Sequence, residues 1–220
     1  MHPSFRFAPA LACAALITPL CLQAQAGNTV LSGSFNTDNQ LYTYDFSTST
    51  TQSYSFFTTS YGGGTNLDGT STPAGGFVPV LTLFYGDGDV IGPSSPGGNA
   101  DPITGLADDA SLSDVLSPGS YILVLSEFPN VAVGNLSDGF LFASDPTATG
   151  DVCGVGGGTF LESDVAPCVQ RTDSYTLDIS SSAVTPEPPS WILLLSSALI
   201  SVAVYRRVLS KLNATSALAR

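Results

Sequence analysis

Apolar and polar residues alternate with a period of two along much of the chain between residues 27 and 184. This alternation places successive side chains on opposite faces and is typical of β-strands with one buried face. It is clearest near the end of this region, where Tyr175, Leu177 and Ile179 share one face. Strands are predicted over residues 31–35, 41–46, 54–57, 77–85, 120–128 and 173–180, with a shorter candidate over residues 140–142.

Two of these segments are the most apolar. Residues 120–128 are apolar on both faces, which predicts a central strand, and residues 77–85 predict a largely buried one. Pro79 lies in the second segment. Because proline cannot donate a hydrogen bond to a neighbouring strand, Pro79 predicts an edge position or a bulge where this strand starts.

Segments rich in Gly, Pro, Asn and Asp separate the predicted strands. They predict turns at residues 38–40 and 117–119, long flexible loops at 61–64 and 68–76, and turn structure throughout 86–102. No helical periodicity of useful length precedes Ser190. Many short strands joined by such turns predict an all-β fold, an antiparallel, jelly-roll-like β-sandwich or a related barrel.

One stretch near the C-terminus breaks this pattern. Residues 191–205 carry no formal charge, follow a proline-rich turn and are followed at once by Arg206 and Arg207. As a helix they would cover roughly 22 Å, less than the roughly 30 Å of a bilayer core, so spanning requires thinning of the bilayer or snorkelling of the arginines. A run of this length also fits a buried core helix. Its position between the prolines and the basic cluster favours a single transmembrane helix.

The N-terminus has the three parts of a secretory signal peptide. Arg6 supplies the positive charge, residues 7–22 form the apolar region, and Ala24-Gln25-Ala26 provides a cleavage site before Gly27. The sequence therefore predicts export.

The charge of the exported part is strongly negative. Between residues 27 and 185 there are 17 Asp and Glu residues, and Arg171 is the only cation, which gives a formal charge of −16. Because nucleic acids are bound chiefly through Lys and Arg, nucleic-acid binding is excluded.

The same region lacks the residues that many enzymes need. It contains no His, no Lys and two Cys, which excludes a Ser-His-Asp triad, a Cys-His pair, a Lys nucleophile and a His-ligated zinc site. Two carboxylates could still hydrolyse a glycosidic bond. The only glutamates between residues 27 and 185 are Glu127 and Glu162, and no Trp precedes Trp191 to hold a sugar, so a hydrolase is the least favoured alternative.

Two cysteines in the predicted loops suggest a covalent cross-link outside the core. Cys153 and Cys168 lie 15 positions apart in a glycine-rich segment. In an oxidising compartment they predict a disulfide worth roughly 3 kcal/mol.

Aspartates cluster beside the strongest predicted strands. Carboxylates in flexible loops are Ca²⁺ ligands, so a weak calcium site at Asp108 and Asp109 with Asp87 or Asp89 is a hypothesis. The segment around Asp87 lacks the rest of an EF-hand, and a solvated acidic rim is the simpler interpretation. No other cofactor is predicted.

The C-terminal stretch resembles the PEP-CTERM sorting signal of Gram-negative bacteria that make exopolysaccharide. The resemblance rests on a Pro-Glu-Pro motif at Pro186, Glu187 and Pro188, a hydrophobic helix, and the basic pair Arg206 and Arg207, in that order. It implies recognition by an exosortase, a membrane protease that cleaves near the motif and passes the protein to the cell surface or matrix. Family members usually end close to the basic cluster, whereas 13 residues follow it here.

The middle of the chain is similar to a PEP-CTERM-associated domain family, itself similar to the bacterial pre-peptidase C-terminal β-sandwiches. The resemblance lies in residues 60–66, 75–84, 101–106, 118–121 and 171–179. This chain has Val78 where the family usually has Asp, and residues 92–95 where the family has an Asp-Asp-Gly segment. The resemblance implies an exported surface or matrix protein without catalytic activity.

These observations predict five parts: a signal peptide (1–26), a β-sandwich ectodomain (27–181), a linker with the Pro-Glu-Pro motif (182–189), a transmembrane helix with its basic cluster (190–207) and a cytoplasmic tail (208–220). The expected location is the inner membrane, with the domain in the periplasm, followed by the cell surface or matrix. Expected partners are the secretion machinery, an exosortase, the membrane and exopolysaccharide. The alternative is an extracellular module that binds carbohydrate or calcium.

Overall fold

The computed structural model of the protein describes residues 27–163, 165–184 and 205–206. The predicted signal peptide, the motif Pro186-Glu187-Pro188, most of the apolar run, Arg207 and the tail 208–220 lie outside the described residues. Within the described ranges, no helix is long and apolar enough to cross a membrane.

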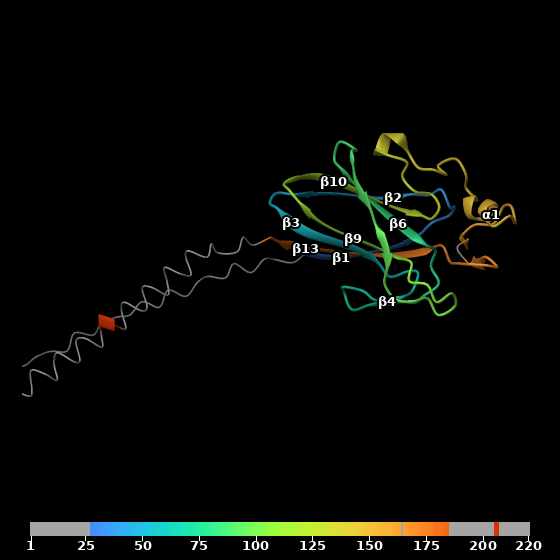
Figure 1. Cartoon of the computed structure of the whole chain (residues 1–220), viewed down its shortest axis with the longest axis horizontal. Coiled ribbons are helices and arrows are strands. Elements are labelled where there is room, and N and C mark those ends of the chain that lie inside the picture. The colour runs from blue at the N-terminus through green and yellow to red at the C-terminus, as the bar shows by residue number, and fades with distance from the viewer. Residues whose placement is uncertain (1–26, 164, 185–204, 207–220) are drawn as a thin grey trace, which may run out of the picture.

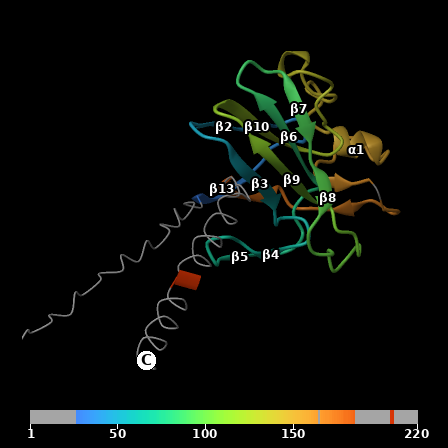
Figure 2. The ribbon, with the colours of Figure 1, turned by 60° about the vertical axis from the view of Figure 1, so that its left-hand side comes forward.

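Two antiparallel sheets pack face to face, which confirms the predicted all-β sandwich (Figures 1 and 2). The five-stranded sheet has the order β1 (Gly27–Ser34), β13 (Ser174–Ala183), β3 (Gln52–Thr58), β9 (Asp109–Leu116) and β8 (Ser95–Gly97). The four-stranded sheet has the order β2 (Tyr42–Thr48), β10 (Gly119–Glu127), β6 (Pro79–Tyr85) and β7 (Val90–Pro93).

Short elements occupy the loops between these strands. Two small hairpins are formed by β4 (Gly64–Thr65) with β5 (Ser71–Thr72) and by β11 (Leu161–Glu162) with β12 (Val169–Gln170). A 3₁₀ turn, η1 (Leu136–Asp138), and one short helix, α1 (Ala148–Val152), lie in the long connection from β10 to β13.

The core fills the space between the two sheets because alternate side chains of each strand face inward. Its largest fully buried members include Phe35, Phe56, Phe77, Leu81, Leu83, Leu123, Leu125 and Leu177. A smaller cluster, Phe84, Val124 and Phe140, lies on the other face of β6 and β10. Both faces of β10 are therefore buried, as the sequence predicted for a central strand.

Both ends of the domain lie at the same end of the sandwich. Gly27, the first residue of β1, pairs with Ser181 of β13, and Ser34 pairs with Ser174 at the opposite end. That opposite end carries α1 and the β11–β12 hairpin (Figure 1). We call it the distal end, because it is farthest from the points where the chain enters and leaves the domain.

Several predicted elements differ from the structure. Residues 140–142 form turns and contribute one isolated bridge, from Ala132 to Phe140, in place of a strand. The segment 86–102, expected to be turns throughout, contains β7 and β8, and β9 was not predicted. The last strand continues to Ala183, two residues beyond the predicted domain boundary.

Pro79 is the first residue of β6, a strand with a neighbour on each side. The missing N–H is tolerated there because β7 pairs only with Thr82, Leu83 and Phe84, so Pro79 has a partner strand on one side alone. The register irregularity of β6 lies between Leu83 and Phe84 and not at the start of the strand. The predicted bulge at the start of the strand was therefore wrong, and β6 as a whole is not an edge strand, but Pro79 itself lies at a position that is unpaired on one side.

Candidate functional site

Arg171, the only cation between residues 27 and 185, is buried at the distal end. Its Nη1 lies 3.1 Å from Asp101 Oδ1, and its Nη2 donates a hydrogen bond of 3.2 Å to Asp101 Oδ2. Its Nε lies 3.7 Å from Glu162 Oε2. The guanidinium therefore forms a two-pronged ion pair with one carboxylate and faces a second.

The same guanidinium closes the loop formed by residues 61–76. It donates hydrogen bonds to the carbonyl oxygens of Tyr61 (3.1 Å) and Gly76 (2.9 Å), and its Cζ lies 4.2 Å from the centre of the Tyr61 ring. Gly75 N also donates to the Tyr61 carbonyl, at 3.0 Å. Arg171 thus fixes both ends of the loop at a single point.

Three ionisable groups around Arg171 have shifted pKa values. Burial and the hydrogen bond to Glu162 raise the pKa of Tyr61. Burial also raises the pKa of Glu162, although Tyr61 and Arg171 oppose this shift. Burial alone would raise the pKa of Asp101, but hydrogen bonds from Arg171 and from the amides of Thr104 and Ile103 lower it overall.

A hollow of about 490 Å³ lies beside this network, between the β4–β5 hairpin and the distal ends of β1 and β13. Nine of the residues that line it carry a hydroxyl group, and none carries a formal charge. Ser60, Gly76 and Thr176 line the hollow and are buried, so they form its floor. Ser32 and Thr172 are exposed and form part of its rim.

The wall of the hollow is rigidly hydrogen-bonded, although the sequence predicted a flexible loop here. The buried amide of Asn66 accepts from Thr59 Oγ1 at 2.6 Å and donates to the hydroxyls of Thr70 and Thr72, both at 2.9 Å. The Thr72 hydroxyl donates in turn to that of Thr176, at 3.1 Å, which ties the hairpin to β13. Asn66 therefore organises the β4–β5 hairpin from within.

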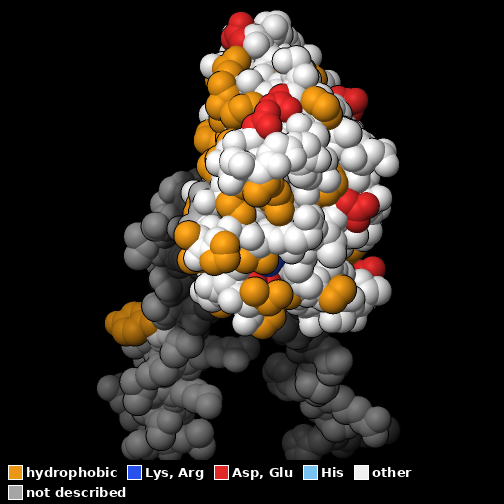
Figure 3. Space-filling view, turned by 90° about the vertical axis from the view of Figure 1, so that its right-hand side faces the viewer, with side chains coloured by type: hydrophobic (Ala, Val, Ile, Leu, Met, Phe, Trp, Pro, Cys, Tyr) orange, Lys and Arg blue, Asp and Glu red, His pale blue; other side chains and the backbone are white. Residues whose placement is uncertain are grey.

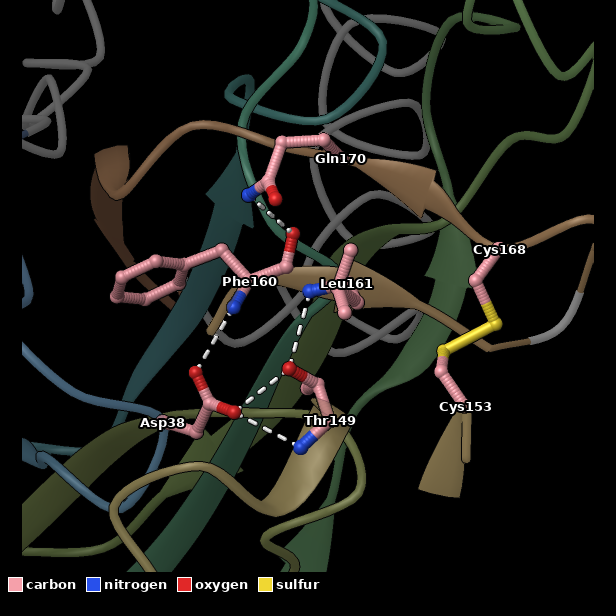
Figure 4. Close-up of a disulfide and its surroundings, with 7 residues drawn as sticks. All are labelled: Asp38, Thr149, Cys153, Phe160, Leu161, Cys168 and Gln170. Atoms are coloured by element: carbon pink, nitrogen blue, oxygen red, sulfur yellow. Dashed lines mark hydrogen bonds between the residues drawn. A yellow bond between two sulfur atoms is a disulfide. The ribbon is translucent and has the colours of Figure 1, made fainter. Parts of the chain in front are cut away.

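A second buried network holds the β10–β13 connection against the sandwich (Figure 4). The Asp38 carboxylate accepts hydrogen bonds from the amide and hydroxyl of Thr149, at 2.8 and 2.6 Å, and from the amide of Phe160, at 2.9 Å. Glu127 at the end of β10 lies beside Asp38. Burial, followed by the charge and hydrogen bonding of Asp38, raises the pKa of Glu127 to about 10. The pair serves to anchor chain segments far apart in sequence.

Cys153 and Cys168 form the predicted disulfide, with a Cα–Cα distance of 6.2 Å. It joins the end of α1 to the segment just before β12, next to the Asp38 network (Figure 4). Disulfides persist in oxidising compartments, so this bond hints at a location outside the cytoplasm.

Removing the disulfide is expected to destabilise the domain without changing its fold. Replacing Cys153 and Cys168 together by Ser should lower the free energy of unfolding by about 3 kcal/mol, because a bond across 15 residues restricts the unfolded chain. Urea denaturation of the parent and the double variant measures the difference. Reducing the parent should lower its stability by the same amount, and an unchanged midpoint would contradict this role.

The predicted calcium ligands are not brought together. Asp87 and Asp89 follow the C-terminal end of β6, whereas Asp108 lines a small cavity with Val78 and Pro79 at its N-terminal end. Asp109 is buried, and its carboxylate accepts hydrogen bonds from the Thr58 hydroxyl and from the amides of Tyr61 and Gly62. In the part of the chain that the structure describes, no group of three or more His, Cys, Asp or Glu residues is placed to hold a metal.

The two glutamates that the hydrolase alternative requires are each 2% exposed. Glu127 is enclosed beside Asp38, and Glu162 is enclosed beside Arg171 and Tyr61. A substrate cannot reach either side chain in this conformation.

Comparisons with known proteins give a weak structural likeness. No protein-family model and no curated protein matches the sequence. The fold is distantly similar to a solved structure, the pre-peptidase C-terminal domain of a collagenase from Bacillus anthracis, with a TM-score of 0.33 and 11% sequence identity. The match covers 70% of this chain and 88% of that domain.

The sequence pointed to few of these site residues. Arg171 stood out only as a lone positive charge, and Asp38 only as part of a turn. A single arginine among 17 acids is nevertheless a signal that could have indicated a buried ion pair. A chain this acidic does not need one more surface charge to stay soluble, so a structural role for the arginine is the simpler explanation. Nothing in the sequence indicated which acids pair with it, since Asp101 is 70 positions away.

The end of the domain that carries α1 and the disulfide shows no large charged surface (Figure 3). Hydrophobic side chains form separate small patches there, and acidic side chains are scattered between them. We take the hollow beside β4 and β5, with a volume of about 490 Å³ and nine hydroxyl-bearing residues in its lining, as the candidate functional site.

Proposed function

We propose that the protein is an exported, non-enzymatic component of the cell surface or exopolysaccharide matrix. In this proposal the signal peptide directs export, residues 190–207 hold the protein in the inner membrane, and an exosortase processes it near Pro186-Glu187-Pro188. The proposal combines the three-part C-terminal sequence with a disulfide-bonded sandwich.

The observation that carries the proposal is the position of the two ends of the domain. Because Gly27 pairs with Ser181, the segments that would insert into a membrane join the sandwich at one end. The hollow lies between the distal ends of β1 and β13, at Ser32 and Ser174. A tethered domain of this construction would present the hollow away from the membrane, toward the matrix.

The buried charges support a structural role over a catalytic one. Arg171, Asp101 and Glu162 hold three distal segments together, and Asp38 with Glu127 holds a fourth. Arg171, Asp101, Glu162 and Asp38 each lie against an opposite charge or bond to backbone amides or carbonyls, and Glu127 is enclosed beside Asp38. An enzyme of the carboxylate type requires such groups at an open surface.

A second candidate is an extracellular module that binds carbohydrate, and the hydroxyl-lined hollow favours it. The calcium version of this alternative has less support, because Asp87 and Asp108 lie near opposite ends of β6.

Cell fractionation with intact-mass measurement tests the proposed function. We expect the protein outside the cytoplasm, lacking residues 1–26 and carrying an oxidised Cys153–Cys168 pair. A variant that lacks residues 190–207 should appear as free protein in the periplasm. Replacing Pro186, Glu187 and Pro188 by Ala should leave full-length protein in the membrane. Recovery of the parent from the cytosol with residues 1–26 intact and two free thiols would contradict the proposal.

A further inference from the structure

We infer that the hollow beside the β4–β5 hairpin binds one residue of a neutral polysaccharide. The inference rests on the proposed extracellular location and adds a ligand class to it. Three properties of the hollow carry it: the chemistry of its lining, the rigidity of its walls and the charge of the domain around it.

The lining selects a neutral, polyhydroxylated ligand. No Asp, Glu, Lys or Arg lines the hollow, so it offers no partner for an ionic ligand. No Leu, Ile, Val, Phe or Met lines it, and its apolar surface belongs to residues such as Pro73, Ala74 and Tyr175, against which the C–H faces of a sugar ring can pack. Nine hydroxyl-bearing residues line it, and a hydroxyl group can both donate and accept, which is the pattern that sugar hydroxyls require. The Asn66 amide is already bonded to Thr59, Thr70 and Thr72 and holds the wall. A volume of about 490 Å³ is within the range of small-molecule sites.

The walls are fixed before any ligand arrives. Arg171 fixes both ends of the loop that carries the hairpin, and the Thr72–Thr176 hydrogen bond joins the hairpin to β13. A site that is already ordered loses little conformational entropy on binding. This matters for a sugar, because each of its hydrogen bonds replaces one made to water.

The border of the hollow is kept open at β1 by a glycine. A Cβ at Gly33 would lie 2.6 Å from the hydroxyl oxygen of Tyr175, a residue that also lines the hollow. The absence of a side chain there leaves room for the tyrosine hydroxyl at the edge of the site. Tyr175 also contributes a ring that packs on Phe35, at 5.2 Å between centroids, and is therefore held in place.

The charge of the domain selects among polysaccharides. The exported part carries a formal charge of −16, so an anionic polymer such as a polyuronide is repelled at low ionic strength. A neutral hexose polymer is not. Because the lining itself is uncharged, binding of a neutral sugar should change little with salt.

Isothermal titration of the exported protein with neutral gluco-, manno- and galacto-oligosaccharides, and with an oligogalacturonide, tests the inference. We expect at least one neutral probe to bind with an affinity that is the same at low and high salt, and the oligogalacturonide to bind at least tenfold more weakly. Thr172→Leu and Ser71→Leu change exposed positions of the lining and should each weaken binding about tenfold, since a lost hydroxyl leaves a sugar group unpaired. Thr43→Leu, at an exposed position of β2 outside the hollow, is the matched control and should bind like the parent.

Each other outcome overturns the inference. If no neutral probe binds, or if Thr172→Leu and Ser71→Leu bind as tightly as Thr43→Leu, the hollow is not the sugar site. A preference for the oligogalacturonide would show that charge does not govern selection. Melting temperatures of the three variants confirm that each is folded. None of these results alters the cellular location or the mass of the processed protein, so the proposed function is judged separately.

Discussion

Replacement of Arg171 by Met is expected to lower the free energy of unfolding by about 3–5 kcal/mol, the range found when one partner of a buried ion pair is removed. Methionine preserves much of the apolar stem and removes the charge. Asp101 would keep its burial but lose its ion pair, and the carbonyl oxygens of Tyr61 and Gly76 would lose a donor. The loss is a large fraction of the stability of an ordinary domain.

Urea denaturation measures this effect, with Arg171→Lys and Arg206→Met as companions. Lysine keeps the charge but cannot make the planar two-pronged contact with Asp101, so we expect an intermediate loss. Arg206 is exposed and outside the sandwich, and its replacement should leave the domain's denaturation midpoint unchanged. If Arg171→Met were as stable as Arg206→Met, the network would not hold the distal end together.

Hydrogen exchange in the β4–β5 hairpin provides a second measurement on the Arg171→Lys variant. Because Arg171 fixes both ends of the 61–76 loop, a folded Arg171→Lys protein should expose the amides of the β4–β5 hairpin to faster hydrogen exchange. The amides of β10, in the centre of the other sheet, should exchange as in the parent. Equal protection of the hairpin amides in both proteins would show that the Arg171 network does not order the walls of the hollow.

Strands whose apolar residues alternate or run continuously were predicted, and β9, whose pattern is interrupted, was missed. β13 follows a period of two and β10 is apolar on both faces, and both were predicted. In β9 the inward positions are Ala110, Leu112, Asp114 and Leu116, so a carboxylate interrupts the apolar series. The residues 140–142 looked like a strand because they are apolar, but Phe140 is buried by packing on Phe84 and Val124 from outside the sandwich. Apolar character therefore does not distinguish a buried strand from a turn that packs on the outer face of a sheet.

The polar networks could not be predicted because they join residues far apart in sequence. Asp38 reaches Thr149 and Phe160, more than 100 positions away, and Asp109 reaches Thr58 across 51 positions. Short-range patterns say which residues are polar but not which polar groups will be enclosed together. The disulfide was predictable because only two cysteines are present in the exported part, which leaves a single pairing.

The stability of the domain is expected to fall as the pH rises from 5 to 8, and Glu127 is the largest single cause. In the folded protein burial and the neighbouring Asp38 raise the pKa of Glu127 to about 10 from 4.5. The folded state therefore keeps a proton that the unfolded state releases above pH 4.5, so the stabilising contribution is complete below that pH and is lost progressively as the pH approaches 10. The slope is at most about 1.4 kcal/mol per pH unit, or about 4 kcal/mol between pH 5 and 8.

Glu127→Gln should remove this slope, because the amide is uncharged at every pH and can donate to Asp38 as the protonated carboxyl does. We expect parent and variant to have similar free energies of unfolding at pH 4.5, and the variant to be more stable by up to about 4 kcal/mol at pH 8. Burial also raises the pKa values of Asp109, Glu162 and Asp178, which favours a loss of stability with rising pH in parent and variant alike. Asp45→Asn, at an exposed position of β2, removes a carboxylate outside the Asp38 network and is the matched control. Equal pH dependence in the parent and in Glu127→Gln would show that Glu127 is ionised inside the fold, and the paired-carboxyl description of the Asp38 anchor would have to be abandoned.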